Sequence, residues 1–147
     1  MLDHDIPHLV IARHDGRRIK SKSSERLVPL SGDALRAAVE SLRVASGEAY
    51  LFPRYVKPRG PDAASAALMK HLKLVRTDSR QTVHSLRHNM KDALRLAEVT
   101  KGDQDTLLGH KSKDAGDIYY GGEAARLQVS LRAIEKALKV HAGAELG

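Results

Sequence analysis

The chain of 147 residues contains no cysteine, so disulfides and thiolate metal sites are excluded. The missing cysteine fits a reducing compartment, and we expect a cytoplasmic location. No apolar run approaches the roughly 20 residues that a membrane-spanning helix needs. The acidic residues close to Met1 are not typical of a secretory signal. These absences predict a protein without a membrane partner.

Aromatic residues are also scarce, at 3% of the chain, whereas hydrophobic residues reach 41%. A hydrophobic core must therefore be built mainly from leucine, valine and alanine. A chain of 147 residues is long enough to bury such a core within one domain. We therefore expect a single domain over residues 1–147.

Positive charge is in excess, because 25 lysines and arginines face 18 acidic residues and give a net charge of +7. A basic surface attracts a polyanion such as DNA, and binding then releases counterions. A basic protein with no such partner has the same composition. Charge alone leaves both interpretations open.

Extended structure is expected near the N-terminus and helices after it. An apolar run over 8–12, a turn signal at Asp15-Gly16 and a second run over 26–30 predict a β-hairpin region at 8–30. Helical periodicity follows Ser31, and helices are expected at 63–74, from about His84, and just before Gly109. The fold class is thus mainly α with a small antiparallel β-sheet near the N-terminus, and 31–120 forms the helical core.

The last helix is expected over 123–140. Its apolar residues recur at helical spacing and form one stripe: Leu127, Leu131, Ile134 and Leu138. Such a stripe is buried either against its own domain or against a second copy of the chain. Both alternatives, including a homo-oligomer through this helix, stay open at this point.

Three short motifs carry residues suited to phosphate chemistry. They are His84-Ser85-Leu86-Arg87-His88, Leu107-Leu108-Gly109-His110 and the pair Tyr119-Tyr120. Arginine presents a fork of donors to a phosphate and stays charged. Histidine donates or moves a proton near neutral pH, and tyrosine supplies a hydroxyl that becomes a covalent nucleophile. On a helix, His84 and Arg87 share one face and can reach the same phosphate.

The order and spacing of these motifs resemble the C-terminal catalytic domain of the tyrosine recombinases, the phage-integrase family. His84 and Arg87 match the family's His-x-x-Arg box, His110 closes its Leu-Gly-His box, and Tyr119 stands nine positions later, where the nucleophile is expected. Upstream, residues 20–30 resemble the family's lysine hairpin, with Lys20 at the lysine position. The resemblance covers roughly residues 10–125.

This resemblance implies DNA strand cleavage and rejoining through a 3′-phosphotyrosyl intermediate, without a cofactor or a metal. The implied catalytic residues are Tyr119, Arg87, His84, His110 and Lys20. Double-stranded DNA is the implied partner, and association with the nucleoid is the implied location. Further DNA contacts are expected from Arg17, Arg18, Lys22, His88 and Lys111.

The chain departs from the family in one respect. The family's first catalytic arginine precedes the lysine hairpin, and nothing in its sequence context precedes Lys20; Arg13, Arg17 and Arg18 lie too close to the hairpin. The N-terminal domain that clamps DNA also has no counterpart. We therefore expect a partial catalytic domain, and a catalytically weak or inactive DNA-binding remnant is the alternative function.

Several of these residue assignments have an alternative. Tyr120, which precedes two glycines, competes with Tyr119, and Lys22 competes with Lys20. His84 and His88 stand four apart and could share a zinc ion, but no carboxylate or cysteine completes such a site. The polar residues of the helix start could simply face solvent, and His110 could serve the helix dipole. A topoisomerase of type IB would use the same tyrosine chemistry.

Overall fold

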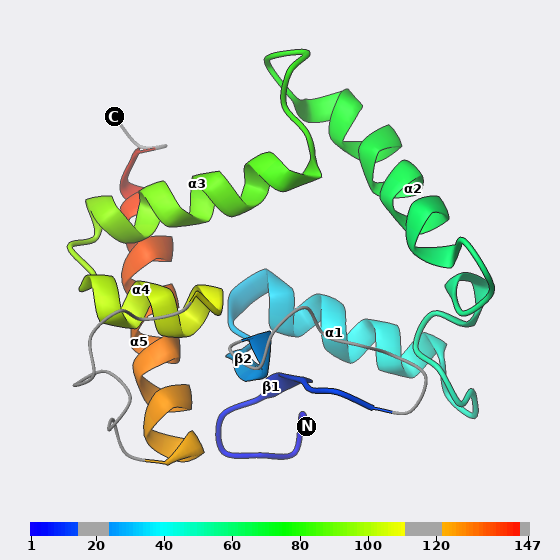
Figure 1. The fold of residues 1–147 in the computed structure, drawn as a ribbon, viewed down its shortest axis with the longest axis horizontal. Coiled ribbons are helices and arrows are strands. Elements are labelled where there is room, and N and C mark those ends of the chain that lie inside the picture. The colour runs from blue at the N-terminus through cyan, green and yellow to red at the C-terminus, as the bar shows by residue number, and fades with distance from the viewer. Residues whose placement is uncertain (15–23, 111–121, 145–147) are drawn as a thin grey trace. The chain divides into compact units, whose positions relative to one another are not determined.

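The computed structural model describes residues 1–14, 24–110 and 122–144, with the backbone alone at 141–144. The described part is mainly helical and has one two-stranded antiparallel sheet, as the sequence predicts (Figure 1). In chain order the elements are β1 (His8–Ile11), β2 (Arg26–Pro29), α1 (Gly32–Val44), a short 3₁₀ helix η2 (Pro53–Tyr55), α2 (Gly60–Val75), α3 (Val83–Leu96), α4 (Lys101–Leu108) and α5 (Glu123–Ala144).

The chain divides into two compact units. The split unit comprises residues 1–36 and 91–147, and the inserted unit comprises residues 37–90. The two boundaries fall within α1 and α3. That both units belong to one partial catalytic domain stays a prediction.

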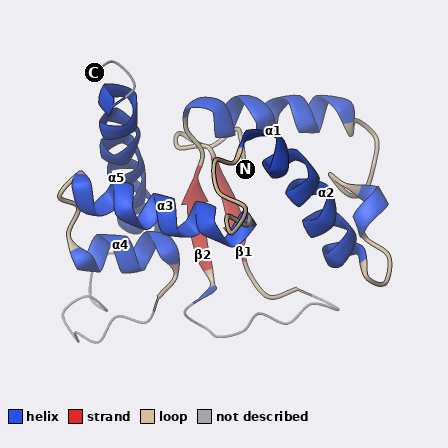
Figure 2. Ribbon diagram, turned by 90° about the horizontal axis from the view of Figure 1, so that it is seen from above, coloured by secondary structure: helices blue, strands red, loops and turns tan. Residues whose placement is uncertain are grey.

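The sheet of the split unit pairs β1 with β2 (Figure 2). His8 lies opposite Pro29, and Ile11 lies opposite Arg26. One more backbone hydrogen bond, from Leu30 N–H to the Pro7 carbonyl at 2.8 Å, extends the pairing past the strand ends. Proline is tolerated at the end of β2, where a strand can lack a donor. The two strands of the 8–30 region are thus confirmed, while the predicted turn at 15–16 lies outside the described residues.

The buried apolar side chains of the described chain all belong to the split unit. α5 packs against β2 and α4 there. Leu94 and Leu127 are the largest apolar side chains that are fully buried, at 0% and 1% exposure. The full set is Leu30, Ala93, Leu94, Val99, Leu107, Leu108, Leu127, Ala133 and Ala137. As the composition predicts, this core is aliphatic.

The helix α5 begins at Glu123, as predicted, and extends past Val140 to Ala144. Its buried face differs from the predicted leucine stripe, because Leu138 is 42% exposed while Ser130, Ala133 and Ala137 are buried beside Leu127. Small side chains let the axis of a helix come close to its neighbours. The face therefore turns its small residues inward, and α5 packs within its own chain; a homo-oligomer through α5 stays a prediction. No helix in the described ranges combines the length and apolar character that crossing a membrane requires.

The inserted unit contains α2, which begins at Gly60 and not at Ala63, where the sequence predicted its start. Pro61 favours this earlier start, because the first turn of a helix leaves its N–H groups unpaired in any case. Gly60 also lies directly against η2, since a Cβ there would come within 1.8 Å of the Tyr55 carbonyl oxygen. The absent side chain thus allows the contact between η2 and α2.

Candidate functional site

His110 is placed by the way α4 ends. The helix begins after Thr100, whose side chain accepts a hydrogen bond from Asp103 N–H. It ends at its C-cap Gly109, which adopts the left-handed conformation (φ 67°, ψ 37°). The N–H groups of Gly109 and His110 both donate to the Asp105 carbonyl, which fixes the turn.

The Asp105 carboxylate lies between two basic side chains. Its Oδ1 is 3.3 Å from His110 Nδ1, and its Oδ2 accepts a hydrogen bond from Lys101 Nζ at 2.7 Å. The Asp105 side chain is only 10% exposed, whereas His110 is 40% and Lys101 85% exposed. A buried carboxylate thus joins two side chains that reach solvent.

The pKa of Asp105 is set by opposing effects. Burial raises the pKa, but the hydrogen bonds and charges of Lys101 and His110 together outweigh burial, and the net pKa lies below the ordinary value of 3.8. Asp105 is therefore ionised at neutral pH. An ionised carboxylate offers both oxygens as acceptors, and both are used here.

Arg26 connects β2 to the same turn. Its Nε donates to the Leu107 carbonyl at 3.1 Å, and its Nη1 donates to the Ser24 carbonyl at 3.0 Å. A Cβ on Gly109 would lie 2.6 Å from Arg26 Nη1. Position 109 thus favours glycine for two reasons, its positive φ and the close approach of this guanidinium.

His84, Arg87 and His88 lie on the first two turns of α3. His84 and His88 are exposed, and their rings meet edge to face with centroids 5.0 Å apart. Arg87 is half-buried. At the start of the helix, the Ser85 hydroxyl accepts a hydrogen bond from the Thr82 N–H at 3.0 Å. This contact satisfies a backbone donor and places the His-x-x-Arg box on regular helix from its first residue.

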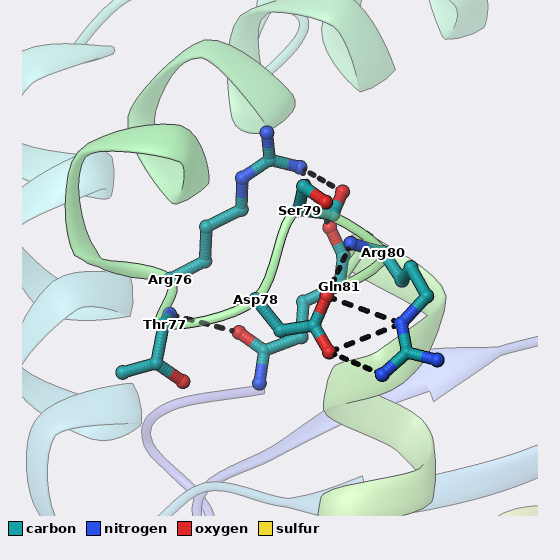
Figure 3. Close-up of polar contacts among 6 residues, drawn as sticks. All are labelled: Arg76, Thr77, Asp78, Ser79, Arg80 and Gln81. Carbon is teal, nitrogen blue, oxygen red and sulfur yellow. Dashed lines mark hydrogen bonds and ion pairs between the residues drawn. The ribbon is translucent and has the colours of Figure 1, made fainter.

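A polar loop leads into α3 (Figure 3). Arg76 Nη1 donates to the carbonyls of Ser79 and Gln81, at 2.6 and 3.3 Å, so this side chain closes the loop on itself. Arg80 forms a forked pair with Asp78, and this pair lowers the pKa of Asp78 below its ordinary value. The loop at 76–81 is therefore held by hydrogen bonds of its own side chains.

The predicted site residues divide into three groups. His110 belongs to the split unit, whereas His84, Arg87 and His88 belong to the inserted unit. The convergence of His84 and Arg87 with His110 on one phosphate therefore stays a prediction. The other predicted residues lie outside the described ranges: Arg17, Arg18, Lys20, Lys22, Lys111, Tyr119 and Tyr120.

The histidine pair of α3, His84 and His88, has a spacing at which two side chains can share a metal ion. Among residues 1–14, 24–110 and 122–144, no three histidine, aspartate or glutamate side chains gather closely enough to hold an ion. His84 and His88 thus have no third ligand among the described side chains.

The sequence interpretation missed Asp105, Lys101 and Arg26. A signal existed for the first two, because Lys101 and Asp105 stand four apart on a short helix and His110 follows at its capped end. Arg26 gave no local signal, since its partner Leu107 lies 81 residues away in sequence.

A scan of protein-family models and searches of curated proteins and solved structures find no match to this chain. The resemblance to the tyrosine recombinases therefore rests on the motif residues themselves.

Proposed function

We propose that this chain binds double-stranded DNA and cleaves and rejoins one strand through a covalent phosphotyrosyl intermediate, in site-specific recombination or integration. One observation carries the proposal: Lys20, His84, Arg87, His110 and Tyr119 occur in the order and at the spacing of the tyrosine recombinases. The buried carboxylate and the glycine turn that hold His110 support it, because they fix a histidine that reaches solvent.

In this reaction His84 accepts the proton of the Tyr119 hydroxyl, and the tyrosine oxygen attacks the phosphorus atom of a phosphodiester. A 3′-phosphotyrosine bond forms as the bond to the 5′ oxygen breaks, and Lys20 gives that oxygen its proton. Arg87 and His110 bind the non-bridging oxygens, where negative charge grows in the transition state. Attack of a 5′-hydroxyl on the phosphotyrosine reverses these steps, so the phosphodiester is restored with no external energy source.

A suicide substrate tests the proposal. DNA with a 5′-bridging phosphorothioate releases a thiol, which does not re-attack readily, so the covalent adduct accumulates on a denaturing gel. We expect an adduct with the natural chain and none with Tyr119→Phe, while Tyr120→Phe keeps it. Loss of the adduct in Tyr120→Phe alone would move the nucleophile to Tyr120, and no adduct in the natural chain would reject cleavage.

A second candidate function is DNA binding without turnover. The observation that favours it is the sequence before Lys20, where no arginine stands in the family's context. Removing one donor that stabilises the transition state costs about 10²–10³ in rate. A chain that lacks this donor could still hold DNA through the basic stretch at 17–22.

Gel shifts at several salt concentrations test DNA binding itself. We expect non-specific binding with a Kd of about 10⁻⁴–10⁻⁶ M that weakens as salt rises. Replacing Arg17 and Arg18 by glutamine should weaken binding, whereas the same change at Arg36 and Arg43, which form exposed ion pairs on α1, should leave it unchanged. Salt-independent affinity would contradict a surface that follows phosphates.

A synaptic complex would need more than one copy of the chain, and DNA binding would place it on the nucleoid. We propose that self-association requires DNA, because the small-residue face of α5 already packs on α4 and β2. Light scattering with and without a DNA duplex tests this, and a DNA-free dimer would contradict it.

A further inference from the structure

The Asp105–His110 contact has the geometry by which a carboxylate orients an imidazole. His110 Nδ1 faces Asp105 Oδ1 at 3.3 Å, and the carboxylate is nearly buried. An ionised carboxylate only accepts hydrogen bonds, so the histidine nitrogen beside it must carry a proton. Lys101 contacts the other oxygen at 2.7 Å and so restricts rotation of the carboxylate.

The side chain and the backbone of Asp105 have separate tasks. Its carbonyl accepts the N–H groups of Gly109 and His110 and so forms the turn at the end of α4. Any residue at position 105 keeps that carbonyl. A substitution there therefore removes the carboxylate from His110 while the turn retains its backbone hydrogen bonds.

We infer that Asp105 is a positioning residue that keeps the proton of neutral His110 on Nδ1, so that Nε2 carries no proton in the neutral ring. In the charged ring, the same contact holds Nε2–H in a fixed direction as a donor. Carboxylates select the tautomer of a histidine in this way in many enzyme and metal sites.

The consequence for DNA rests on the proposed function. A non-bridging phosphate oxygen accepts hydrogen bonds, so His110 contacts it through Nε2–H of the charged ring. Because the contact with Asp105 fixes the direction of the ring, Asp105 would orient this Nε2–H toward the phosphate without touching DNA.

Histidine tautomers are measured directly by ¹⁵N-edited NMR on the isolated chain, at a pH where the ring is neutral. We expect His110 of the natural chain to be protonated on Nδ1. Free imidazole side chains favour the proton on Nε2, so Asp105→Ala should move the proton of His110 to that nitrogen. Asp103→Asn is the matched control, because it removes a carboxylate from the same helix and should leave the tautomer unchanged.

Three outcomes decide the inference. An Nδ1-protonated ring in the natural chain that changes in Asp105→Ala supports it. The inference is overturned by an unchanged tautomer in that variant, or by an Nε2-protonated ring in the natural chain. Should Asp105→Ala fail to fold, the natural chain still decides by its own tautomer, and the near-isosteric Asp105→Asn replaces the alanine variant.

A second experiment, which measures DNA cleavage, distinguishes failure of this inference from failure of the proposed function. In the suicide-substrate assay, Asp105→Asn should lower the adduct rate about 10–100-fold, the loss typical when a carboxylate that orients a histidine is removed, while Asp103→Asn keeps the rate. Asp105→Glu should restore part of the rate if the carboxylate itself acts. An adduct rate that is unchanged in Asp105→Asn would refute the role in catalysis. The absence of any adduct with the natural chain would reject the proposed function and leave the tautomer result standing.

Discussion

The split unit and the inserted unit both contain helices with apolar side chains, but only the split unit buries such side chains in a core. Every buried apolar side chain of the described chain lies in the split unit, whereas Gly60 is the single buried residue described in the inserted unit. The apolar residues of α1 and α2 stay open to solvent instead, with Val39 and Leu42 at 52% and Leu68 at 56% exposure. An amphipathic pattern predicts a helix, but a core forms only where a second element covers the apolar face.

The difference predicts different sources of stability. In the split unit, burial of leucine and alanine on α3, α4 and α5 removes apolar surface from water, which is the main favourable term of folding. The inserted unit instead has ion pairs such as Arg43–Glu40 and Arg80–Asp78, which are exposed and contribute little. Substitutions should therefore affect the two units unequally.

The largest contrast is expected between two helical leucines. Leu94→Ala, at a side chain with 0% exposure, should lower the free energy of unfolding by about 2–5 kcal/mol, since it removes buried contacts and leaves a cavity. Leu74→Ala, at 81% exposure on α2, should change it by less than about 0.5 kcal/mol. Urea denaturation measures both, and equal losses would show that Leu74 is covered in solution.

A second pair lies within the inserted unit. Gly60→Ala puts a Cβ 1.8 Å from the Tyr55 carbonyl oxygen, so α2 and η2 must separate at a cost of about 1–3 kcal/mol. Gly47→Ala meets no atom within 4 Å and adds only the strain of a positive φ of 86°. Hydrogen exchange should show that Gly60→Ala weakens protection in α2 and leaves α5 unaffected. Equal weakening in α5 would mean that the two units unfold together.

A third test concerns the turn beside His110. Gly109→Ala should cost about 1–2 kcal/mol from the left-handed backbone and more from the displaced Arg26. In an Arg26→Ala background there is no guanidinium to displace, so Gly109→Ala should cost only the backbone strain. The stability losses of Gly109→Ala and Arg26→Ala should therefore be non-additive in a double-mutant cycle. Gly32→Ala has a positive φ of 52° and no atom within 4 Å, and serves as the control for strain alone. Additive effects would mean that Arg26 moves away without loss.

The smallest change in stability is expected when the pH is lowered. The folded pKa of Asp105 is lowered, so its contribution to stability is present above the ordinary pKa of 3.8 and is lost as pH falls through the folded value. The contribution is at most about 1 kcal/mol, because Lys101 is 85% exposed and water screens the pair. The natural chain should therefore have a higher free energy of unfolding than Asp105→Asn at neutral pH. This difference between the two proteins should shrink below about pH 4. A difference in the free energy of unfolding that stays constant from pH 7 to acid would contradict an ionised Asp105 that stabilises the fold.

The sequence predicted where helices and strands occur better than it predicted which side of each helix is buried. The turn chemistry at Gly109 and the strand runs at 8–12 and 26–30 are local signals, and the structure confirms them. The buried face of α5 depends on the spacing to α4 and β2, which local periodicity does not contain, so Leu138 was wrongly placed in the stripe. Arg26 was missed for the same reason, because its hydrogen-bond partner is distant in sequence.

The hydrogen bond from Arg26 to Leu107 also has a consequence for synthesis of the chain. It spans 81 residues, so about 4–16 s separate the two partners at a translation rate of 5–20 residues per second. During that time the inserted unit emerges from the ribosome, while β1 and β2 lack α4 and α5. A two-stranded hairpin alone is marginally stable. The N-terminal strands are therefore the part of the nascent chain that depends longest on segments not yet made, and α5 completes their core last.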